Sequence, residues 1–295
     1  MLNSLLIVIE QTCIHLPLVI GAYFSFSLLK APDLSIEAAY TFGAITSALA
    51  LQSLSPDFCV LGIAIALIFS ILGGCFVGFL SGTFTRKIGI PHLLSSIVTI
   101  GLFHGINQYV LGGAIFSLSN LINPIELNLG SETPFLIFSA LVLFSLSFLF
   151  LKTQLGNMLA VHGNNPSFFA NYNISMSFVF IFGICIANAL AGISGYLDAQ
   201  TSGFVEIGMG IGKALSCVTA IILGRVLTMT SRPMNTFIPV VGTFAYFVIQ
   251  HALINVGFNL KYFTMVQAAI VLIALAFYYR NRGNNIFEKI DNLGV

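Results

Sequence analysis

Long apolar blocks constrain the fold of this chain more than any other feature. Most are about 20 residues long, the length that crosses a bilayer as a helix. They lie at about 4–29, 36–54, 58–84, 90–112, 134–151, 175–199, 208–228, 235–256 and 262–279. Only 7% of the 295 residues are charged, against about a quarter in soluble domains. The sequence therefore predicts an all-α, polytopic transmembrane helical bundle of about 8–9 hydrophobic segments, formed by residues 1–295 as a single domain.

Composition also disfavours several classes of protein. A β-barrel would show short alternating segments instead of long apolar blocks. The net charge of +1 and the lack of a basic patch give no sign of nucleic-acid binding. The five cysteines lie in apolar segments without metal-ligand spacing, so we expect packing roles and no metal site. The first block lacks the basic start of a cleavable signal, and we interpret it as a retained membrane helix.

The distribution of charge orients the chain, because basic residues concentrate on the cytoplasmic side of membranes. One alternating arrangement puts most basic residues on a single side, with Lys261 as the exception: Arg86, Lys87, Lys152, Arg225, Arg232, Arg280, Arg282 and Lys289. The acidic residues Glu126, Glu132, Asp198 and Glu206 then lie on the other side. This arrangement predicts an external loop at 113–133, and a segment 153–174 and a tail 281–295 in the cytoplasm.

The second block, 36–54, is harder to place. Pro32 and Pro56 flank it, and it is short for a membrane span. It either spans the membrane or forms a broken or re-entrant helix, and the side of the N-terminus stays open.

Small residues recur at every fourth position in three places. Such ridges let helix backbones approach closely in lipid. The ridges are Gly74, Gly78 and Gly82; Ala187, Ala191, Gly195 and Ala199; and Gly208, Gly212, Ser216, Ala220 and Gly224. We expect the third ridge to be one helix-packing face, which a Gly212→Leu change would splay.

Ionisable residues inside apolar blocks are expensive and need a reason. Glu10 and His15 are expected to face the bundle interior. Asp33 is placed to cap the helix of the second block, with Ser35 as a competing cap, or to face a solute pathway together with Glu37.

Further charges surround the segment near residue 200. Asp198 and Glu206 bracket an outer turn, as loop charges or as contacts for an extracytoplasmic partner, and Lys213 could pair with Glu206. The isolated histidines His92, His104 and His251 are interpreted as packing residues.

The string GMGIGKA resembles a phosphate-binding loop but does not meet its requirements. Ile207 occupies the place of the first glycine, and Ala214 replaces the hydroxyl that would hold magnesium. We therefore expect no cofactor in this chain; if transport is driven by ATP, a separate subunit binds ATP and Mg.

The polar segment 153–174 predicts a short helix, a turn and a second short helix. Leu155, Met158 and Leu159 form an apolar stripe, Gly163 suits a helix C-cap, and Pro166 can open the next turn. Phe168 and Phe169 follow and are expected to be exposed, a surface that a soluble ATPase could cover. The alternative is that this loop packs on its own bundle.

Three stretches, at 31–44, 155–175 and 188–212, carry a family resemblance. They resemble the permease subunits of bacterial ABC importers of the branched-chain amino acid/ribose type. APDLSIEAAYTFGA (31–44) is similar to the PDLTVEGSF form of amino-acid permeases of the tryptophan/tyrosine uptake type. LGNMLAVHGNNPSFFANYNIS resembles the cytoplasmic coupling segment, with matches at Gly156, Ala160, Gly163, Asn165, Ala170 and Ile174. NALAGISGYLDAQTSGFVEIGMGIG resembles the following helix, outer turn and glycine-rich entry. The resemblance covers about residues 30–280.

The resemblance implies a non-catalytic transmembrane subunit of an importer in the bacterial inner membrane. Its implied partners are an ABC ATP-binding subunit, an extracytoplasmic substrate-binding protein and a second permease copy, as a homodimer or heterodimer. The implied ATPase-docking residues are Gly156, Gly163, Asn164, Asn165, Pro166, Phe168 and Phe169. The candidates near the translocation pathway are Asp33, Glu37, Asn188, Gln200 and Gly210. The expected solute is an amino acid or related small polar compound, with a sugar or nucleoside as the alternative.

Two departures from the family pattern concern the coupling segment. Asn157 and Val161 stand at or near the family's arginines, and Asn173 replaces the usual glycine. An ATPase with an adapted groove, or an inactive transporter, would be consistent with them.

Two other classes stay in view. An ion-coupled secondary transporter working without an ATPase would use Glu10, His15, Asp33 or Glu37 as coupling groups, but the inverted repeats typical of that class are not evident. An intramembrane enzyme would need a catalytic pair at helical depth, and the sequence offers none.

Overall fold

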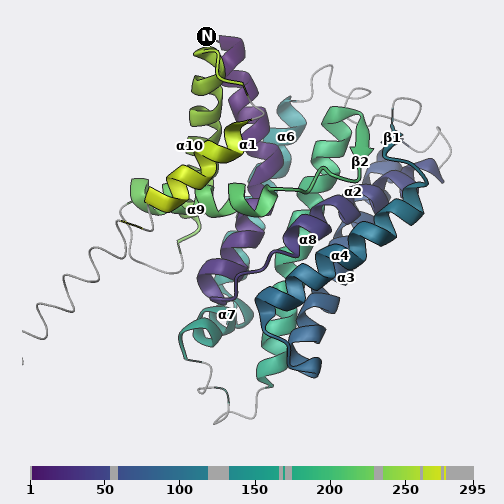
Figure 1. The fold of residues 1–295 in the computed structure, drawn as a ribbon, viewed down its shortest axis with the longest axis vertical. Helices are drawn as coiled ribbons and strands as arrows, with labels where there is room; N and C mark the ends of the chain where they lie inside the picture. Colours follow the sequence, from purple (N-terminus) through teal and green to yellow (C-terminus); the bar gives the residue numbers. More distant parts are fainter. Residues whose placement is uncertain are drawn as a thin grey trace, which may run out of the picture.

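The computed structural model describes residues 2–53, 59–118, 133–165, 169, 175–228, 235–259, 262–273 and 276. This part of the chain is a bundle of helices with one short pair of strands (Figure 1). The elements are α1 (Leu2–Tyr23), η1 (Phe24–Leu28), α2 (Ile36–Gln52), α3 (Cys59–Thr83), η2 (Phe84–Ile88), α4 (His92–Leu111), β1 (Ile115–Ser117), α6 (Thr133–Lys152), α7 (Gln154–Asn164), α8 (Met176–Ser202), β2 (Phe204–Glu206), α9 (Lys213–Thr228) and α10 (Phe237–Asn255). A further helix covers Phe263–Ile273.

The predicted helical membrane bundle is confirmed. Five helices in the described part are long and apolar enough to cross a bilayer. They are Ser4–Leu28, Gly62–Ile88, Thr133–Lys152, Met176–Ser202 and Phe237–Asn255. Their boundaries lie within a few residues of the predicted blocks.

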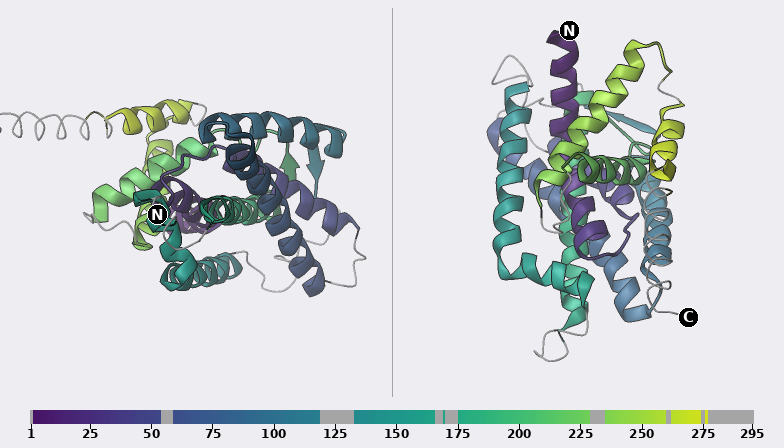
Figure 2. Two further views of the ribbon diagram at one scale, coloured as in Figure 1. Left: turned by 90° about the horizontal axis from the view of Figure 1, so that it is seen from below. Right: turned by 90° about the vertical axis from the view of Figure 1, so that its left-hand side faces the viewer.

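Helix α8 is the centre of the bundle, with α1, α2 and α3 packed around it (Figures 1 and 2). Glycines allow the helices to approach this closely, because they have no side chain. A Cβ at Gly78 of α3 would lie 2.7 Å from the Ile184 carbonyl oxygen, and one at Gly195 of α8 would lie 2.0 Å from the Tyr40 carbonyl oxygen. The first two predicted ridges are therefore backbone contact surfaces, as expected.

The second block forms α2, a continuous helix of 17 residues and not a broken one. At 1.5 Å per residue it is about 26 Å long, slightly less than the hydrocarbon core of a bilayer. Most of its side chains are buried, because it lies between α3 and α8. Gly43 makes the crossing possible: a Cβ there would lie 2.4 Å from the Cα of Gly192.

The two strands pair antiparallel, with Phe116 opposite Val205. The pairing puts the end of α4 and the end of α8 side by side, at the end of the molecule opposite α7 (Figure 1). Strands here were not predicted, since each has only three residues. The remainder of the expected external loop, 119–132 with Glu126 and Glu132, and the tail 281–295 lie outside the described residues.

The third small-residue ridge is wrong in its first half. Helix α9 begins only at Lys213, and Gly208 and Gly212 lie in the turn before it. Gly212 has a φ of +81°, which a helix cannot accommodate, and the space around it is open. Leucine at this position would strain the backbone and would not splay two helices.

The second half of that ridge lies against α10. A Cβ at Gly224 would lie 2.1 Å from the Ile238 carbonyl oxygen, and one at Gly242 would lie 2.0 Å from the Ala220 carbonyl oxygen. Ser216 is half-buried and donates a hydrogen bond to the Lys213 carbonyl within its own helix.

We predict that Gly78→Leu separates α3 from α8. The obstructing atoms are backbone atoms that cannot rotate away, so the cost should reach or exceed the roughly 1–3 kcal/mol typical of overpacking. Thermal unfolding of the detergent-solubilised protein should show a clearly lower midpoint. Gly113→Leu is the matched control, because a side chain there meets open space. Equal midpoints for the two variants would contradict the packing described here.

Candidate functional site

Helix α7 is a short amphipathic helix that follows α6 directly. Thr153 caps it by accepting a hydrogen bond from the Gly156 backbone N–H at 3.3 Å. Gly156 permits the sharp corner, since a Cβ there would lie 2.4 Å from the Phe150 carbonyl oxygen. The inner face of α7 is buried, whereas Asn164 and Asn165 at its end are exposed.

Two predictions for this segment are wrong. Gly163 is not a C-cap, because α7 continues to Asn164. A glycine is needed there because α7 crosses the main chain of Leu28: a Cβ at position 163 would lie 1.9 Å from the Leu28 carbonyl oxygen. Phe169 is not exposed but 1% accessible, with its ring 6.0 Å from that of His162. For Phe169, the alternative that the loop packs on its own bundle holds. Pro166 and Phe168 lie outside the described residues.

An arginine from the end of α3 helps to fix α7. The Arg86 guanidinium lies 2.8 Å from Nε2 of His162 and 4.2 Å from the centre of the Phe180 ring. Burial, and then the charge of Arg86, lowers the pKa of His162 to about 4. The imidazole is therefore neutral near pH 7 and accepts the hydrogen bond from Arg86. This contact joins η2, α7 and α8 at one end of the bundle.

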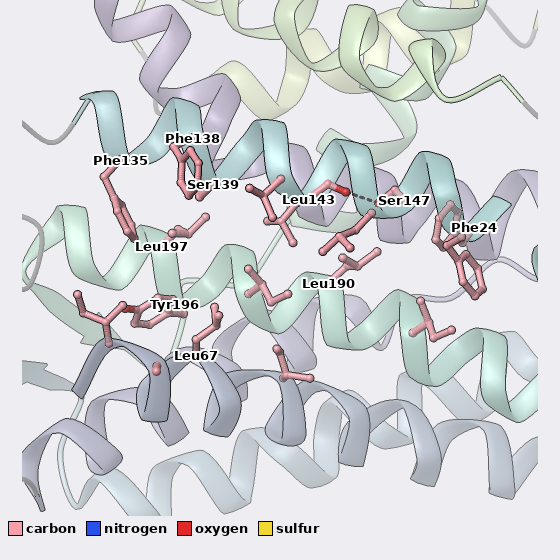
Figure 3. Close-up of a pocket in the computed structure, with 18 residues that line it drawn as sticks. Phe24, Leu67, Phe135, Phe138, Ser139, Leu143, Ser147, Leu190, Tyr196 and Leu197 are labelled. Carbon is pink, nitrogen blue, oxygen red and sulfur yellow. Dashed lines mark hydrogen bonds between the residues drawn. The ribbon is translucent and has the colours of Figure 1, made fainter. Parts of the chain in front are cut away.

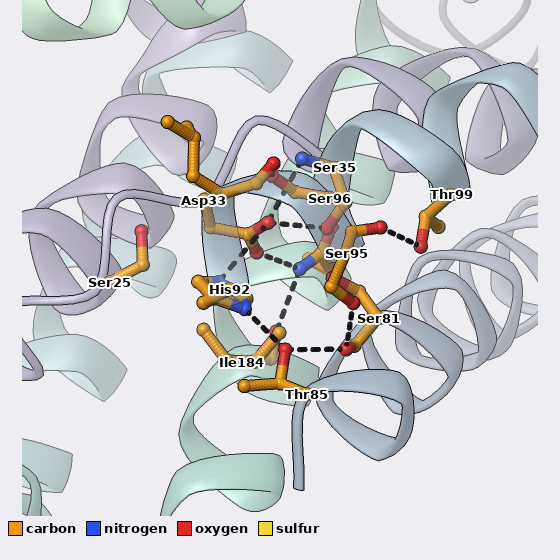
Figure 4. A network of polar contacts seen from close by, with 12 residues as sticks. Ser25, Asp33, Ser35, Ser81, Thr85, His92, Ser95, Ser96, Thr99 and Ile184 are labelled. Atoms are coloured by element: carbon orange, nitrogen blue, oxygen red, sulfur yellow. Dashed lines mark hydrogen bonds and ion pairs between the residues drawn. The ribbon is translucent and has the colours of Figure 1, made fainter. Parts of the chain in front are cut away.

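Asp33 lies at the centre of a buried polar network (Figure 4). Its Oδ1 accepts hydrogen bonds from the Ser35 backbone N–H at 2.9 Å and the Ser35 hydroxyl at 2.6 Å. Its Oδ2 accepts one from Asn188 Nδ2 of α8 at 2.7 Å. Asp33 thus binds Ser35, the residue before α2. It does not cap the helix itself, because its carboxylate oxygens accept hydrogen bonds from Ser35 and Asn188. These three donors offset the cost of burying the carboxylate.

His92 extends this network to α4 and is more than a packing residue. Its Nε2 lies 3.6 Å from Asp33 Oδ1, an ion-pair contact when the ring is protonated and not a hydrogen bond, and its Nδ1 lies 3.0 Å from the Thr85 hydroxyl. Thr85 in turn donates to the Ser81 carbonyl at 3.1 Å, so the ring donates to Thr85. The network therefore joins the segment before α2 to α3, α4 and α8.

A second buried cluster surrounds Lys213. Its Nζ lies 2.7 Å from His15 Nε2, 3.8 Å from Asp198 Oδ2 and 4.7 Å from the centre of the Tyr40 ring. The Tyr40 hydroxyl donates to Asp198 at 2.5 Å. His15 Nδ1 faces the Gln11 carbonyl at 3.1 Å, so Nε2 is the bare nitrogen that accepts from the lysine.

This cluster corrects two expectations. Asp198 belongs to α8 and is largely buried, not a loop charge. Lys213 pairs with Asp198 and not with Glu206, which is exposed on β2. Glu10 and His15 do face the bundle interior as expected: His15 contacts Lys213, and Glu10 accepts a hydrogen bond from Thr133 of α6 at 2.5 Å. Glu10 and His15 lie a little more than one turn apart on α1, and their side chains contact different helices.

Glu37 and Gly210 meet at the start of α9. Glu37 accepts a hydrogen bond from the Ala214 backbone N–H at 3.1 Å and so satisfies the free N-terminus of that helix. A Cβ at Gly210 would lie 2.2 Å from the Glu37 carbonyl oxygen. Gln200 is 3% exposed on α8, and its Nε2 lacks a partner in the described structure. Of the five candidate pathway residues, the structure thus joins Asp33 to Asn188 and Glu37 to Gly210.

One face of α4 was missed by the sequence analysis. Gly101, His104, Gly105 and Gln108 recur at helical spacing, and all four are exposed. A histidine, a glutamine and two glycines form a poor surface for lipid. The signal was present in the spacing of His104 and Gln108, four residues apart in an apolar helix.

The sequence gives several matches to known proteins. The family model described as "Branched-chain amino acid transport system / permease component" matches residues 4–275. The tyrosine transport system permease protein of Clostridioides difficile (strain R20291) is 30% identical over 286 residues, which cover 93% of this chain and 91% of the relative.

Two further relatives are more distant. The uncharacterized protein RP368 of Rickettsia prowazekii (strain Madrid E) is 27% identical over 285 residues, covering 93% of this chain and 98% of its own. The autoinducer 2 import system permease protein LsrC of Yersinia pestis (strain Pestoides F) is 24% identical over 230 residues, covering 76% of this chain and 63% of its own. No solved structure matches this chain.

We predict that Lys213→Met strongly destabilises the protein. The change leaves the carboxylate of Asp198 buried without its cation, and breaking a buried pair on one side costs about 3–5 kcal/mol. The double variant Lys213→Met, Asp198→Asn should recover part of the loss, because asparagine still accepts from Tyr40. Thermal unfolding in detergent measures both. A single variant as stable as the parent would show that the pair does not hold α8 to α9.

Proposed function

Since the chain belongs to the family of branched-chain amino acid transport system permease components, we propose that it is the membrane-spanning subunit of an ATP-driven ABC importer. It performs no bond chemistry: a separate ABC ATP-binding subunit binds ATP and Mg. An extracytoplasmic substrate-binding protein delivers the solute. ATP binding and hydrolysis in that subunit push the coupling segment that contains α7. The helices then rock between outward-open and inward-open states.

The observation that carries this proposal is the placement of α7. This helix lies at one end of the bundle, with its inner face fixed by Arg86 and by the main chain of Leu28. Its outer face presents Leu155, which is 37% exposed, and the polar residues Asn157, Asn164 and Asn165. A helix fixed to η1, η2 and α8 can transmit a push from a docked ATPase into the bundle. Gly156 and Gly163 hold the docking helix in place, and Asn164 and Asn165 form its exposed end. Pro166 and Phe168 remain docking candidates from the sequence and lie outside the described residues.

The orientation follows from the same argument. We place α7, Arg86 and Lys152 in the cytoplasm, and the β1–β2 end on the exterior of the inner membrane. The basic residues of the described chain support this orientation, because Arg86, Lys87 and Lys152 gather at the α7 end. The C-terminus lies on the cytoplasmic side.

A second permease copy would lie against α4 and helix Phe263–Ile273. The two helices form one edge of the molecule, and α6 forms the opposite edge, as both views in Figure 2 show. Met265 and Leu272 are 72% and 68% exposed there. Two copies meeting along this edge would enclose the stripe formed by Gly101, His104, Gly105 and Gln108, which then lines the translocation pathway.

The pathway residues predicted from the sequence lie further inside the bundle than this stripe. Glu37 and Gly210 border a small pocket of about 30 Å³ that His104 and Asn107 of α4 also line. Asp33, Asn188 and Gln200 are deeper in the bundle. Glu37 and Gly210 would therefore be closest to a solute, and Asp33 and Asn188 would hold α4 and α8 in register.

For the solute, an amino acid or a related small polar compound is proposed, with a sugar or nucleoside as the alternative. The support is the name of the tyrosine transport permease, which matches 93% of this chain at 30% identity, against 76% at 24% for the autoinducer 2 permease.

Leu155→Asp should abolish co-purification of the co-expressed ABC ATP-binding subunit. A carboxylate in the centre of an apolar docking contact stays unpaired after burial. Ile115→Asp is the control, since Ile115 is 62% exposed at the β1 end and should leave the complex intact. Retention of the ATPase by the Leu155 variant, or its loss from the Ile115 variant, would contradict the docking assignment.

Cysteine substitution along α4 tests the pathway. A small polar thiol reagent should modify cysteines at 101, 104, 105 and 108, because that face lies along water, and should spare buried positions 103 and 107. Uptake assays on the same variants should show loss of transport after modification. Absence of reaction at all four positions would mean that the stripe faces lipid or a dry interface.

A further inference from the structure

A long apolar groove separates α6 from α3 and α8 (Figure 3). Its volume is about 690 Å³, within the range of small-molecule sites. Its wall is formed by carbon-rich side chains such as Leu67, Leu143 and Leu190, with Phe135 near one end and Phe24 near the other. Helix α6 packs on α1 and α7, so the groove is where it lacks protein contact.

The groove lies within the depth of the membrane. The three helices around it are all candidate spans. Along α6 it extends from Phe135 to Phe150, about 22 Å at 1.5 Å per residue. This length exceeds half of a hydrocarbon core of about 30 Å. Water is a poor occupant, because an apolar wall offers it no hydrogen bonds.

One polar atom is out of place in this wall. The Tyr196 side chain is 1% exposed, and its hydroxyl has no hydrogen-bond partner in the described structure. A buried phenol normally finds an acceptor. Tyr196 lies near the end of the groove marked by Phe135. Phe135 lies two residues after the start of α6, and Tyr196 lies six residues before the end of α8. That level is close to the membrane interface, where the ester groups of phospholipids lie.

We propose that one acyl chain of a bilayer phospholipid occupies this groove, and that an ester carbonyl of the same lipid accepts a hydrogen bond from the Tyr196 hydroxyl. The lipid then forms part of the contact that holds α6 to the bundle. A second copy of this chain is a poorer occupant, because the edge with α4 and Phe263–Ile273 lies on the opposite side (Figure 2). The proposal is independent of any ATPase or solute.

The test uses the full-length chain in nanodiscs that contain a phosphatidylcholine with a diazirine in the middle of one acyl chain. After illumination, mass spectrometry should find adducts concentrated on groove residues such as Leu143 and Leu190. Leu143→Trp fills the groove and should reduce these adducts at least about fivefold. Leu141→Trp is the matched control on the same helix, since Leu141 is 60% exposed and does not line the groove.

A second measurement does not depend on tolerance of tryptophan. Tyr196→Phe removes only the donor, and native mass spectrometry should show phospholipid retention lowered by roughly two- to tenfold, the worth of one hydrogen bond. Adducts spread evenly over the exposed apolar residues of α3 and α6 would overturn the proposal, as would unchanged retention in Tyr196→Phe. Chain-to-chain crosslinks from a Ser139→Cys variant would overturn it in favour of a second copy.

Discussion

The helices of this protein meet at glycines, where no side chain separates the two main chains. The other contacts between the helices depend on this close approach. Around α8, main chain touches main chain: positions for a Cβ at Gly74 and Gly21 lie 2.3 and 2.4 Å from the carbonyl oxygens of Asn188 and Ala187. In a lipid solvent, no hydrophobic gain favours one apolar contact over another, so close dispersion contact and buried hydrogen bonds must hold helices together. Close approach also places polar groups within reach, which is how Asn188 meets Asp33.

Much of the fold follows from the sequence, because a bilayer leaves helices as the natural form for long apolar blocks. The block boundaries and the ridges Gly74–Gly82 and Ala187–Ala199 needed only local information. The ridge from Gly208 failed for a specific reason: periodicity of small residues does not reveal a positive φ, and Gly212 ends the turn before α9. Side-chain partners were equally hidden. Lys213 lies seven residues from Glu206 in sequence, yet the tertiary fold brings it to Asp198 and His15.

The sequence predicted the short helix α7, whereas the contacts of several residues in and around it could not be predicted. The amphipathic pattern of 154–164 predicted the short helix α7, but Phe169 packs inward beside the ring of His162, a long-range contact that no sequence pattern shows. Charged side chains form one network around Asp33 and another around Lys213, and each joins helices that are far apart in sequence. Such networks favour one arrangement of helices over its alternatives. We propose that the stripe on α4 faces a partner copy and that the groove beside α6 holds lipid.

The account depends most on which face of the membrane each end of the bundle occupies. In a cysteine-free background, single cysteines at Asn164, the last residue of α7, and at Gly113, before β1, can be treated in intact cells with an impermeant maleimide. The account predicts that Gly113→Cys reacts in intact cells, whereas Asn164→Cys reacts only after the membrane is opened. Labelling of Asn164→Cys in intact cells would place α7 outside, away from any ATPase, and would contradict the account.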